Sequence, residues 1–306
     1  MKHLLKLGDL SPDEIKEIID LADQLKKDRK KGKRNKELKG KSLGMIFQKS
    51  STRTRVSFEV GMYQLGGEAL FLSSHDTQLG RGEPVEDTAR VLSRYLDGIM
   101  IRTFAQSDVE KMAKWGSVPV INGLTDYAHP CQVLADLQTI REYKGGWEDL
   151  KLTFIGDGNN MANSLIVGGI KMGMKVSIAC PPGYEPDGDI VKWADKTGRF
   201  QCTSSVEEAA EHADVLYTDV WASMGEENEA LQRNVDFSGY QINGETVAAA
   251  SPDVMVMHCL PAHRGMEISS DVMDKYEKEI FDQAENRLHA QKAVLVLLLG
   301  DTSCES

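Results

Sequence analysis

Short apolar segments alternate with amphipathic helical segments along most of the chain, and this alternation restricts the possible folds more than any other feature. The segments that are short and apolar enough to be buried strands are residues 43–47, 69–72, 98–102, 118–122, 151–156, 175–180, 215–218 and 254–258. Strands that alternate with helices pair in parallel, and their helices cover both faces of the sheet. We therefore predict an α/β protein.

A length of 306 residues allows one large domain or two ordinary ones. A long helix is predicted to end near Tyr143, and a new strand begins at Lys151. We predict two doubly wound domains, residues 1–145 and 146–285, each a parallel sheet flanked by helices and joined to the other by long helices. The apolar C-terminal helix, residues 286–306, is expected to pack back and complete the first domain.

The composition excludes several classes of protein. The formal net charge of −11 argues against a general nucleic-acid or membrane-surface binder. The longest apolar run, residues 293–299, is too short to span a membrane, and the start of the chain lacks a signal-peptide pattern. The five cysteines form no Cys-x-x-Cys pair. We therefore expect a cytoplasmic protein with reduced thiols and no structural zinc.

A basic stretch runs from Lys26 to Lys41, at the end of a helix that begins with the capping box of residues 11–14. Cations are favourable near the C-terminus of a helix, and a charge run is usually a solvated surface. We interpret this stretch as a solvated surface and not as a nucleic-acid patch.

The run Ser-Thr-Arg-Thr-Arg at residues 51–55 directly follows the predicted strand 43–47. It is predicted to begin a helix in which Val56, Val60 and Tyr63 share one face. Free N–H groups, hydroxyls and guanidiniums at such a turn bind a phosphate-sized anion well. The alternative is an ordinary N-cap followed by surface arginines. Because five such residues follow a buried strand, we favour the phosphate site.

Two glycine-rich segments resemble nucleotide-binding motifs without matching them. Gly40-Lys41-Ser42 precedes its strand instead of following one, unlike a P-loop. The turn at residues 156–161 follows a strand, but Met161 replaces the third glycine of a dinucleotide fingerprint. An NAD-dependent oxidoreductase is therefore disfavoured.

Four further polar clusters fall at predicted strand ends or helix starts, where open α/β sheets bind their ligands. They are Arg102, the sequence His-Pro-Cys-Gln at 129–132, the sequence Asp-Val-Trp-Ala-Ser-Met-Gly at 219–225, and the sequence His-Cys-Leu-Pro at 258–261. Each one alone could be structural. Their shared topological position favours a common site.

Taken together and in this order, these motifs resemble those of the aspartate/ornithine carbamoyltransferase family, and the last two resemble its ornithine branch. The resemblance covers essentially the whole chain. It implies a transferase that moves the carbamoyl group of carbamoyl phosphate to the δ-amine of L-ornithine and gives L-citrulline and phosphate. It also implies a homotrimer with sites at subunit interfaces, and no metal or organic cofactor.

The resemblance further implies a role for individual residues. Those expected to contact carbamoyl phosphate are Ser51, Thr52, Arg53, Thr54, Gln78, Arg102, His129, Gln132, Cys259, Leu260 and Arg287. Gln78 would serve the site of a neighbouring subunit. Arg102, His129 and Cys259 are the expected catalytic residues, with the Cys259 thiol near the attacking amine.

Asn160, Asp219, Ser223 and Met224 would position ornithine through its α-ammonium and α-carboxylate. Alternative acceptors are putrescine and N-acetylornithine. Putrescine has no α-carboxylate for the Ser223-Met224 pair to hold, and Asp219 disfavours aspartate. A non-catalytic paralogue is the remaining alternative.

Overall fold

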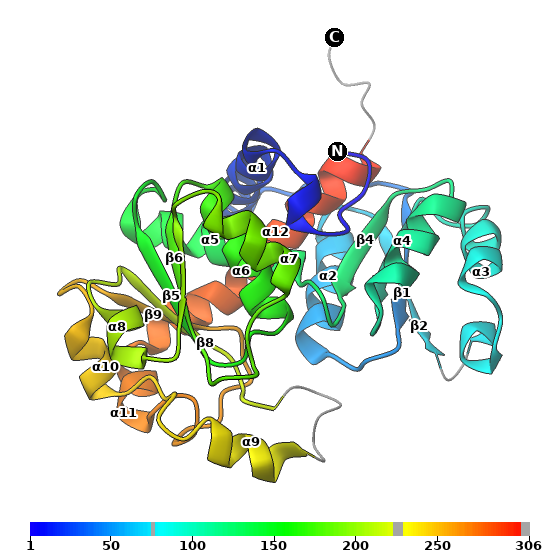
Figure 1. The fold of residues 1–306 in the computed structure, drawn as a ribbon. Coiled ribbons are helices and arrows are strands. Elements are labelled where there is room, and N and C mark those ends of the chain that lie inside the picture. Colours follow the sequence, from blue (N-terminus) through cyan, green and yellow to red (C-terminus); the bar gives the residue numbers. More distant parts are fainter. Residues whose placement is uncertain (75–76, 223–228, 301–306) are drawn as a thin grey trace. The chain divides into compact units, whose positions relative to one another are not determined.

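The computed structural model describes residues 1–74, 77–222 and 229–300. The chain divides into two compact units. Unit 1 consists of Met1–Ala135 with Asn286–Ser306, and unit 2 of Asp136–Glu285. Two helices, α5 (Pro130–Lys144) and α12 (Glu277–Leu299), each continue from one unit into the other (Figure 1).

Unit 1 is built on a parallel sheet with the strand order β2-β1-β3-β4. Its strands are β1 (Ser42–Phe47), β2 (Glu68–Ser73), β3 (Gly98–Arg102) and β4 (Val120–Leu124). Its other elements are the short turns η1 (Leu7–Asp9) and η3 (Gln78–Arg81) and the helices α1 (Pro12–Lys30), α2 (Thr52–Gln64), α3 (Val85–Leu92) and α4 (Gln106–Trp115). Every residue of β3 is buried, as expected for a central strand covered on both faces.

Unit 2 is built on a second parallel sheet, in the order β7-β6-β5-β8-β9. Its strands are β5 (Lys151–Ile155), β6 (Lys175–Ala179), β7 (Phe200–Thr203), β8 (Val215–Thr218) and β9 (Met255–His258). Its helices besides α5 and α12 are α6 (Asn160–Lys171), α7 (Gly188–Asp195), α8 (Val206–Ala210), α9 (Ala230–Asp236), α10 (Gly244–Ala249) and α11 (Ser270–Lys275). The predicted α/β class with two parallel sheets is confirmed.

Two local expectations need correction. The sequence analysis missed β7, an edge strand whose side chains are half-buried or exposed, so it lacks the apolar run of a central strand. In α2, Val56 and Tyr63 were expected on an apolar face, but they are 50% and 81% exposed. The buried face instead contains Phe58 and Met62.

The reason for the α2 correction lies in the helix against which it packs. A Cβ atom at Gly61 would lie 3.4 Å from Cγ of Lys292, so α2 and α12 approach closely along this face. Small residues allow such an approach, and for that reason the buried face of α2 looks weakly apolar in the sequence. In the described part of the chain, no helix combines the length and the apolar character needed to cross a bilayer.

Candidate active site

The N-terminus of α2 forms one side of the candidate site in unit 1. Ser51 is the N-cap, and its side-chain oxygen accepts a hydrogen bond from the N–H of Thr54 at 3.2 Å. The capping interpretation is therefore right for Ser51. It does not exclude anion binding, because the helix start still presents N–H groups and a positive dipole end. Thr52, the first residue of the helix, is exposed.

Arg287 on α12 connects α2 and α5 within unit 1. Its buried guanidinium donates to the side-chain oxygen of Gln132 at 2.6 Å and to that of Thr54 at 3.1 Å. These contacts join three segments that are far apart in the sequence. They hold the guanidinium beside the start of α2, as expected if Arg287 belongs to an anion site.

Arg53, Arg102 and Arg287 are close enough to affect one another and His129. Burial, followed by the charges of Arg287 and Arg53, lowers the pKa of Arg102 to about 10. The pKa of His129 is held well below its usual value, first by burial and then by Arg287, Arg102 and Arg53. The structure thus brings together three guanidiniums and a neutral imidazole.

Among the described residues, no anion neutralises Arg102. It lies at the end of β3 with its side chain buried, and the described residues provide no ion pair for its guanidinium and no acceptor for its Nε. A buried charge without a counterion is unfavourable. A doubly charged ligand is the natural counterion for such a cluster.

Two other residues singled out in unit 1 form no hydrogen bond with the arginine cluster in the described part of the chain. Gln78 begins η3 with an exposed side chain, and in the described structure no hydrogen bond connects it to the arginines. Cys131, inside the His-Pro-Cys-Gln motif, is structural: burial raises the pKa of its thiol to about 12, and its Sγ donates to the backbone oxygen of Asn122.

Polar side chains also gather at the carboxyl ends of β8 and β9 in unit 2. Donor atoms of Asp219, His258 and Cys259 all lie within 4.8 Å of one another. Asp219 is buried and accepts a hydrogen bond from the N–H of Val220 at 2.8 Å, and Cys259 is half-buried. Asp219 and Cys259, two of the predicted site residues, therefore lie close together within unit 2.

His258 fixes the backbone that follows Cys259. Its Nε2 lies 3.0 Å from Glu267, and its Nδ1 accepts the N–H of Leu260 at 2.8 Å. Leu260 adopts a φ of 58°, a left-handed conformation that is unfavourable for leucine. The hydrogen bond to His258 stabilises this conformation.

The same contacts test the cluster as a metal site. With one ring nitrogen against Glu267 and the other accepting the N–H of Leu260, His258 has no lone pair left for a metal ion. The cluster does not fit a metal without rearrangement. The expectation that no cofactor is needed stays a prediction.

Asn160 is the first residue of α6, which Asn159 caps by accepting the N–H groups of residues 161 and 162. Asp157, in the turn before α6, accepts from Arg233 at 2.7 Å in a buried ion pair. The other two predicted ornithine ligands, Ser223 and Met224, lie outside the described residues.

Comparison of the chain with known protein families identifies the family to which it belongs. Residues 2–142 match the carbamoyl-P binding domain of aspartate/ornithine carbamoyltransferase, and residues 148–298 match its Asp/Orn binding domain. The chain belongs to the aspartate/ornithine carbamoyltransferase family. The resemblance inferred from the motifs is thereby confirmed.

Individual relatives belong to the ornithine branch of this carbamoyltransferase family. The ornithine carbamoyltransferase of Oceanobacillus iheyensis is 56% identical over 305 residues, or 98% of this chain and 95% of the relative. That of Thermococcus kodakarensis is 54% identical over 304 residues, or 98% and 96%. The solved ornithine carbamoyltransferase of Pyrococcus furiosus has a TM-score of 0.93 at 52% identity and covers 97% of both chains.

A buried network behind the strand ends of unit 2 escaped the sequence analysis. Gln283 on α12 donates to Asp136 at 2.8 Å and to the Tyr217 hydroxyl at 3.0 Å, and it accepts the N–H of His258 at 3.0 Å. The hydroxyl of Tyr217 in turn donates to Asp136 at 3.0 Å. Burial and the nearby charges of Asp136, Cys259 and Asp219 raise the pKa of Tyr217 well above its usual value.

These residues lie in helices and strands instead of in a recognisable motif. The only available signal was a polar residue at an otherwise buried position, which is also common in ordinary cores.

Proposed function

We propose that the protein transfers the carbamoyl group of carbamoyl phosphate to the δ-amine of L-ornithine and releases L-citrulline and phosphate. One observation carries the proposal. Arg53, Arg102 and Arg287 converge with a neutral His129 at the start of α2, and the described residues supply no anion to neutralise Arg102. The names of the relatives agree with this activity.

The chemistry follows from the charges in unit 1. The arginines, with Ser51, Thr52 and Thr54, would hold the phosphate group. Attack at the carbamoyl carbon builds negative charge on its oxygen, and donors aimed at that oxygen lower the barrier. A neutral imidazole carries one N–H and can donate it there, so we assign this role to His129, with Gln132 beside it.

The acceptor would bind to unit 2. Asp219 and Asn160, with Ser223 and Met224, would position the α-groups of ornithine. Cys259 would lie near the attacking δ-amine, and the backbone of Leu260 would contact the carbamoyl group. Only the neutral amine is a nucleophile, so turnover should rise with pH into the alkaline range.

The domain roles belong to the same proposal. Residues 1–145, completed by 286–306, would bind carbamoyl phosphate, and residues 146–285 would bind ornithine. We also propose that the protein works in the cytoplasm.

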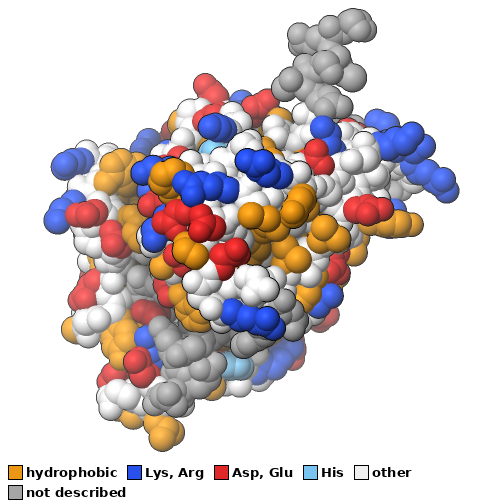
Figure 2. Space-filling view, turned by 90° about the vertical axis from the view of Figure 1, so that its right-hand side faces the viewer, with side chains coloured by type: hydrophobic (Ala, Val, Ile, Leu, Met, Phe, Trp, Pro, Cys, Tyr) orange, Lys and Arg blue, Asp and Glu red, His pale blue; other side chains and the backbone are white. Residues whose placement is uncertain are grey.

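We further propose a homotrimer in which Gln78 reaches the site of a neighbouring subunit. On β2, an edge strand, Leu70 and Phe71 are 48% and 38% exposed. Figure 2 shows hydrophobic side chains gathered between charged ones on one face of the molecule. Exposed apolar groups on a sheet edge favour association with another chain.

The test is citrulline formation from carbamoyl phosphate, with L-ornithine compared against putrescine, N-acetyl-L-ornithine and L-aspartate. We expect L-ornithine to be the preferred acceptor by far. Preference for another amine would support one of the alternative acceptors, and no turnover with any of them would favour a non-catalytic paralogue.

Variants extend the test to the residues. Arg53→Ala should weaken carbamoyl phosphate binding by about 2–5 kcal/mol, because it removes a charged contact from a buried site. The matched control is Arg90→Ala, which removes an exposed guanidinium of α3 that pairs with Asp87. Equal affinities in the two variants would contradict the assignment of Arg53.

A further inference from the structure

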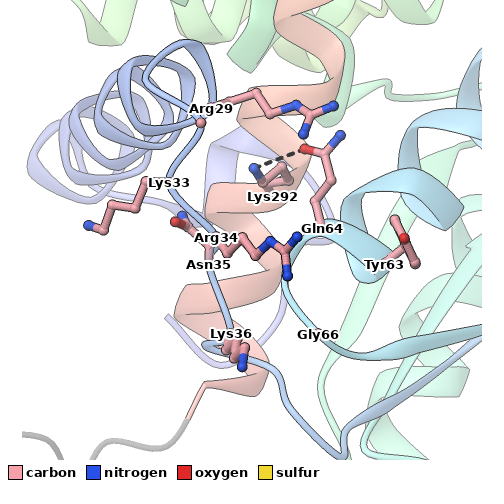
Figure 3. A pocket seen from close by; sticks show the side chains of 10 residues that line it. Arg29, Lys33, Arg34, Asn35, Lys36, Tyr63, Gln64, Gly66 and Lys292 are labelled. Carbon is pink, nitrogen blue, oxygen red and sulfur yellow. Dashed lines mark hydrogen bonds between the residues drawn. The ribbon is translucent and has the colours of Figure 1, made fainter.

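Unit 1 contains a second basic site, formed from elements at the opposite end of α2 from Ser51. A cavity of about 470 Å³ lies between the end of α1, the segment after it, the C-terminal end of α2, and α12 (Figure 3). Its size falls within the range of small-molecule sites. Arg29, Arg34, Lys36 and Lys292 line it.

The charges of this cavity are poorly balanced. Lys33 also lines it, but its ammonium pairs with Asp28 at 2.8 Å, and Figure 3 shows its side chain directed away from the other cations. For Arg29, Arg34 and Lys36, the described residues provide no ion pair. Apart from Asp28, the acidic residue that acts on Lys292 is Glu37, which is exposed.

Lys292 is the buried cation of this cavity. It is buried on α12, and its Nζ donates to the side-chain oxygen of Gln64 at 3.2 Å. In Figure 3 the guanidiniums of Arg29 and Arg34 lie above and below this hydrogen bond. Four cations therefore surround one cavity, and guanidiniums are well suited to phosphate because they bind it through two parallel hydrogen bonds.

Asn35 provides an independent sign of a missing ligand. Its side chain lines the cavity and is only 8% exposed. Within the part of the chain that the structure describes, neither its amide nitrogen nor its amide oxygen has a hydrogen-bond partner. Buried polar groups in native proteins are nearly always paired, so an amide with both atoms unpaired calls for an explanation. A polar ligand in the cavity would supply it.

We propose that this cavity binds a small phosphorylated molecule at a site separate from the carbamoyl phosphate site. The number of cations and the volume favour a ligand with more than one phosphate group over orthophosphate. The assignment does not depend on the proposed reaction, because none of the residues that line the cavity belongs to the predicted carbamoyl phosphate set.

The experiment measures binding of pyrophosphate and tripolyphosphate to the full chain by calorimetry, with orthophosphate for comparison. It uses the Arg53→Ala background, so that binding to the first site does not obscure the second. We expect one pyrophosphate or tripolyphosphate per chain, bound more tightly than orthophosphate.

Two charge-matched double variants locate the binding. Arg29→Ala/Arg34→Ala removes two cations from the cavity. Lys27→Ala/Lys30→Ala removes two exposed cations of α1, the helix that contains Arg29, and neither of them lines the cavity. We expect the first pair to weaken binding about tenfold or more, which corresponds to about 1.4 kcal/mol, and the second to change it by less than about twofold. Circular dichroism checks that both variants fold.

Three outcomes would overturn the proposal. They are no binding in the Arg53→Ala background, equal losses in the two double variants, and binding that is insensitive to Arg29→Ala/Arg34→Ala. Equal losses would mean that only the general positive charge of this surface attracts the anion.

Discussion

Replacing Arg102 with methionine should stabilise the protein without its ligand while destroying the binding of phosphate. The guanidinium of Arg102 is buried, it is repelled by Arg287 and Arg53, and no ion pair from the described residues compensates it. Methionine keeps an unbranched apolar stem in place of the aliphatic part of arginine and removes the charge. The Arg102→Met variant therefore separates the role of this residue in folding from its role in binding.

The magnitude follows from the pKa of Arg102, which burial and its neighbours lower to about 10. Each pKa unit corresponds to about 1.4 kcal/mol, so the charged side chain costs roughly 3 kcal/mol in the folded protein. Imperfect packing of methionine will offset part of this amount. We expect the free energy of unfolding to rise by about 1–3 kcal/mol when no phosphate is present.

The pH dependence of this gain has a definite sign. Up to about pH 9, a unit below the lowered pKa, both the folded and the unfolded chain hold the proton on Arg102, so the full penalty is present in the wild type. As the pH rises through 10, the folded protein loses this proton first and the penalty falls. The advantage of Arg102→Met should therefore be constant from pH 7 to about 9 and shrink at higher pH.

Urea unfolding with and without inorganic phosphate measures both effects. Phosphate should stabilise the wild type by mass action and leave Arg102→Met almost unchanged. The control is Arg90→Met, an exposed arginine whose replacement should alter stability by less than about 0.5 kcal/mol. A loss of stability of more than about 1 kcal/mol in Arg102→Met without ligand would contradict this prediction, and so would equal stabilisation of both proteins by phosphate.

Three further predictions concern unit 2 and the thiols. In Gly158→Ala the new Cβ would lie 2.3 Å from the backbone carbonyl carbon of Glu185. We therefore expect the variant to be destabilised by about 1–3 kcal/mol, measurable as a lower Tm. An unchanged Tm would contradict the close approach of these two segments. Asp157→Ala removes the closer ion-pair partner of the buried Arg233, which keeps Glu229 at 3.3 Å, and should destabilise by about 1–3 kcal/mol in urea unfolding. A loss below about 0.5 kcal/mol would mean that the pair is solvated. At pH 8 iodoacetamide should label the exposed Cys202 well before the buried Cys131, because burial raises the pKa of the Cys131 thiol to about 12. Peptide mapping shows the order of labelling. If Cys131 were labelled first, it would not be buried in solution.

The strands were predictable where burial on both faces leaves a continuous apolar run. The sequence Gly98–Arg102 shows this clearly, because all five residues are buried and the predicted bounds are those observed. The edge strand Phe200–Thr203 faces solvent in part, so its sequence carries no such run. The buried face of α2 was misread because Gly61 allows α12 to approach, and a small residue contributes little to an apolar pattern.

The residues of the candidate site likewise differ in how far the sequence could predict them. Side chains at strand ends and helix starts, such as Arg102 in unit 1 and Asp219 in unit 2, could be proposed from the sequence because each parallel sheet collects such side chains at its own carboxyl edge. The buried network behind the strand ends of unit 2 arises instead from tertiary packing. Gln283 bonds Tyr217 and Asp136 from positions in helices and strands where a polar residue has no local signature.

The basic stretch after α1 shows why charge alone cannot be assigned from sequence. Its cations, read as one solvated surface, have three different environments. Lys26 is buried and donates to Asn286 at 2.7 Å, whereas Lys33 pairs with Asp28 beside solvent. Arg34 has neither kind of partner among the described residues, and it lines the cavity to which Lys292 contributes from α12. A lysine or arginine is structural, solvated or ligand-binding according to what the rest of the fold brings to it. For Lys26, the deciding side chain is Asn286, which comes from a helix 260 residues later in the chain.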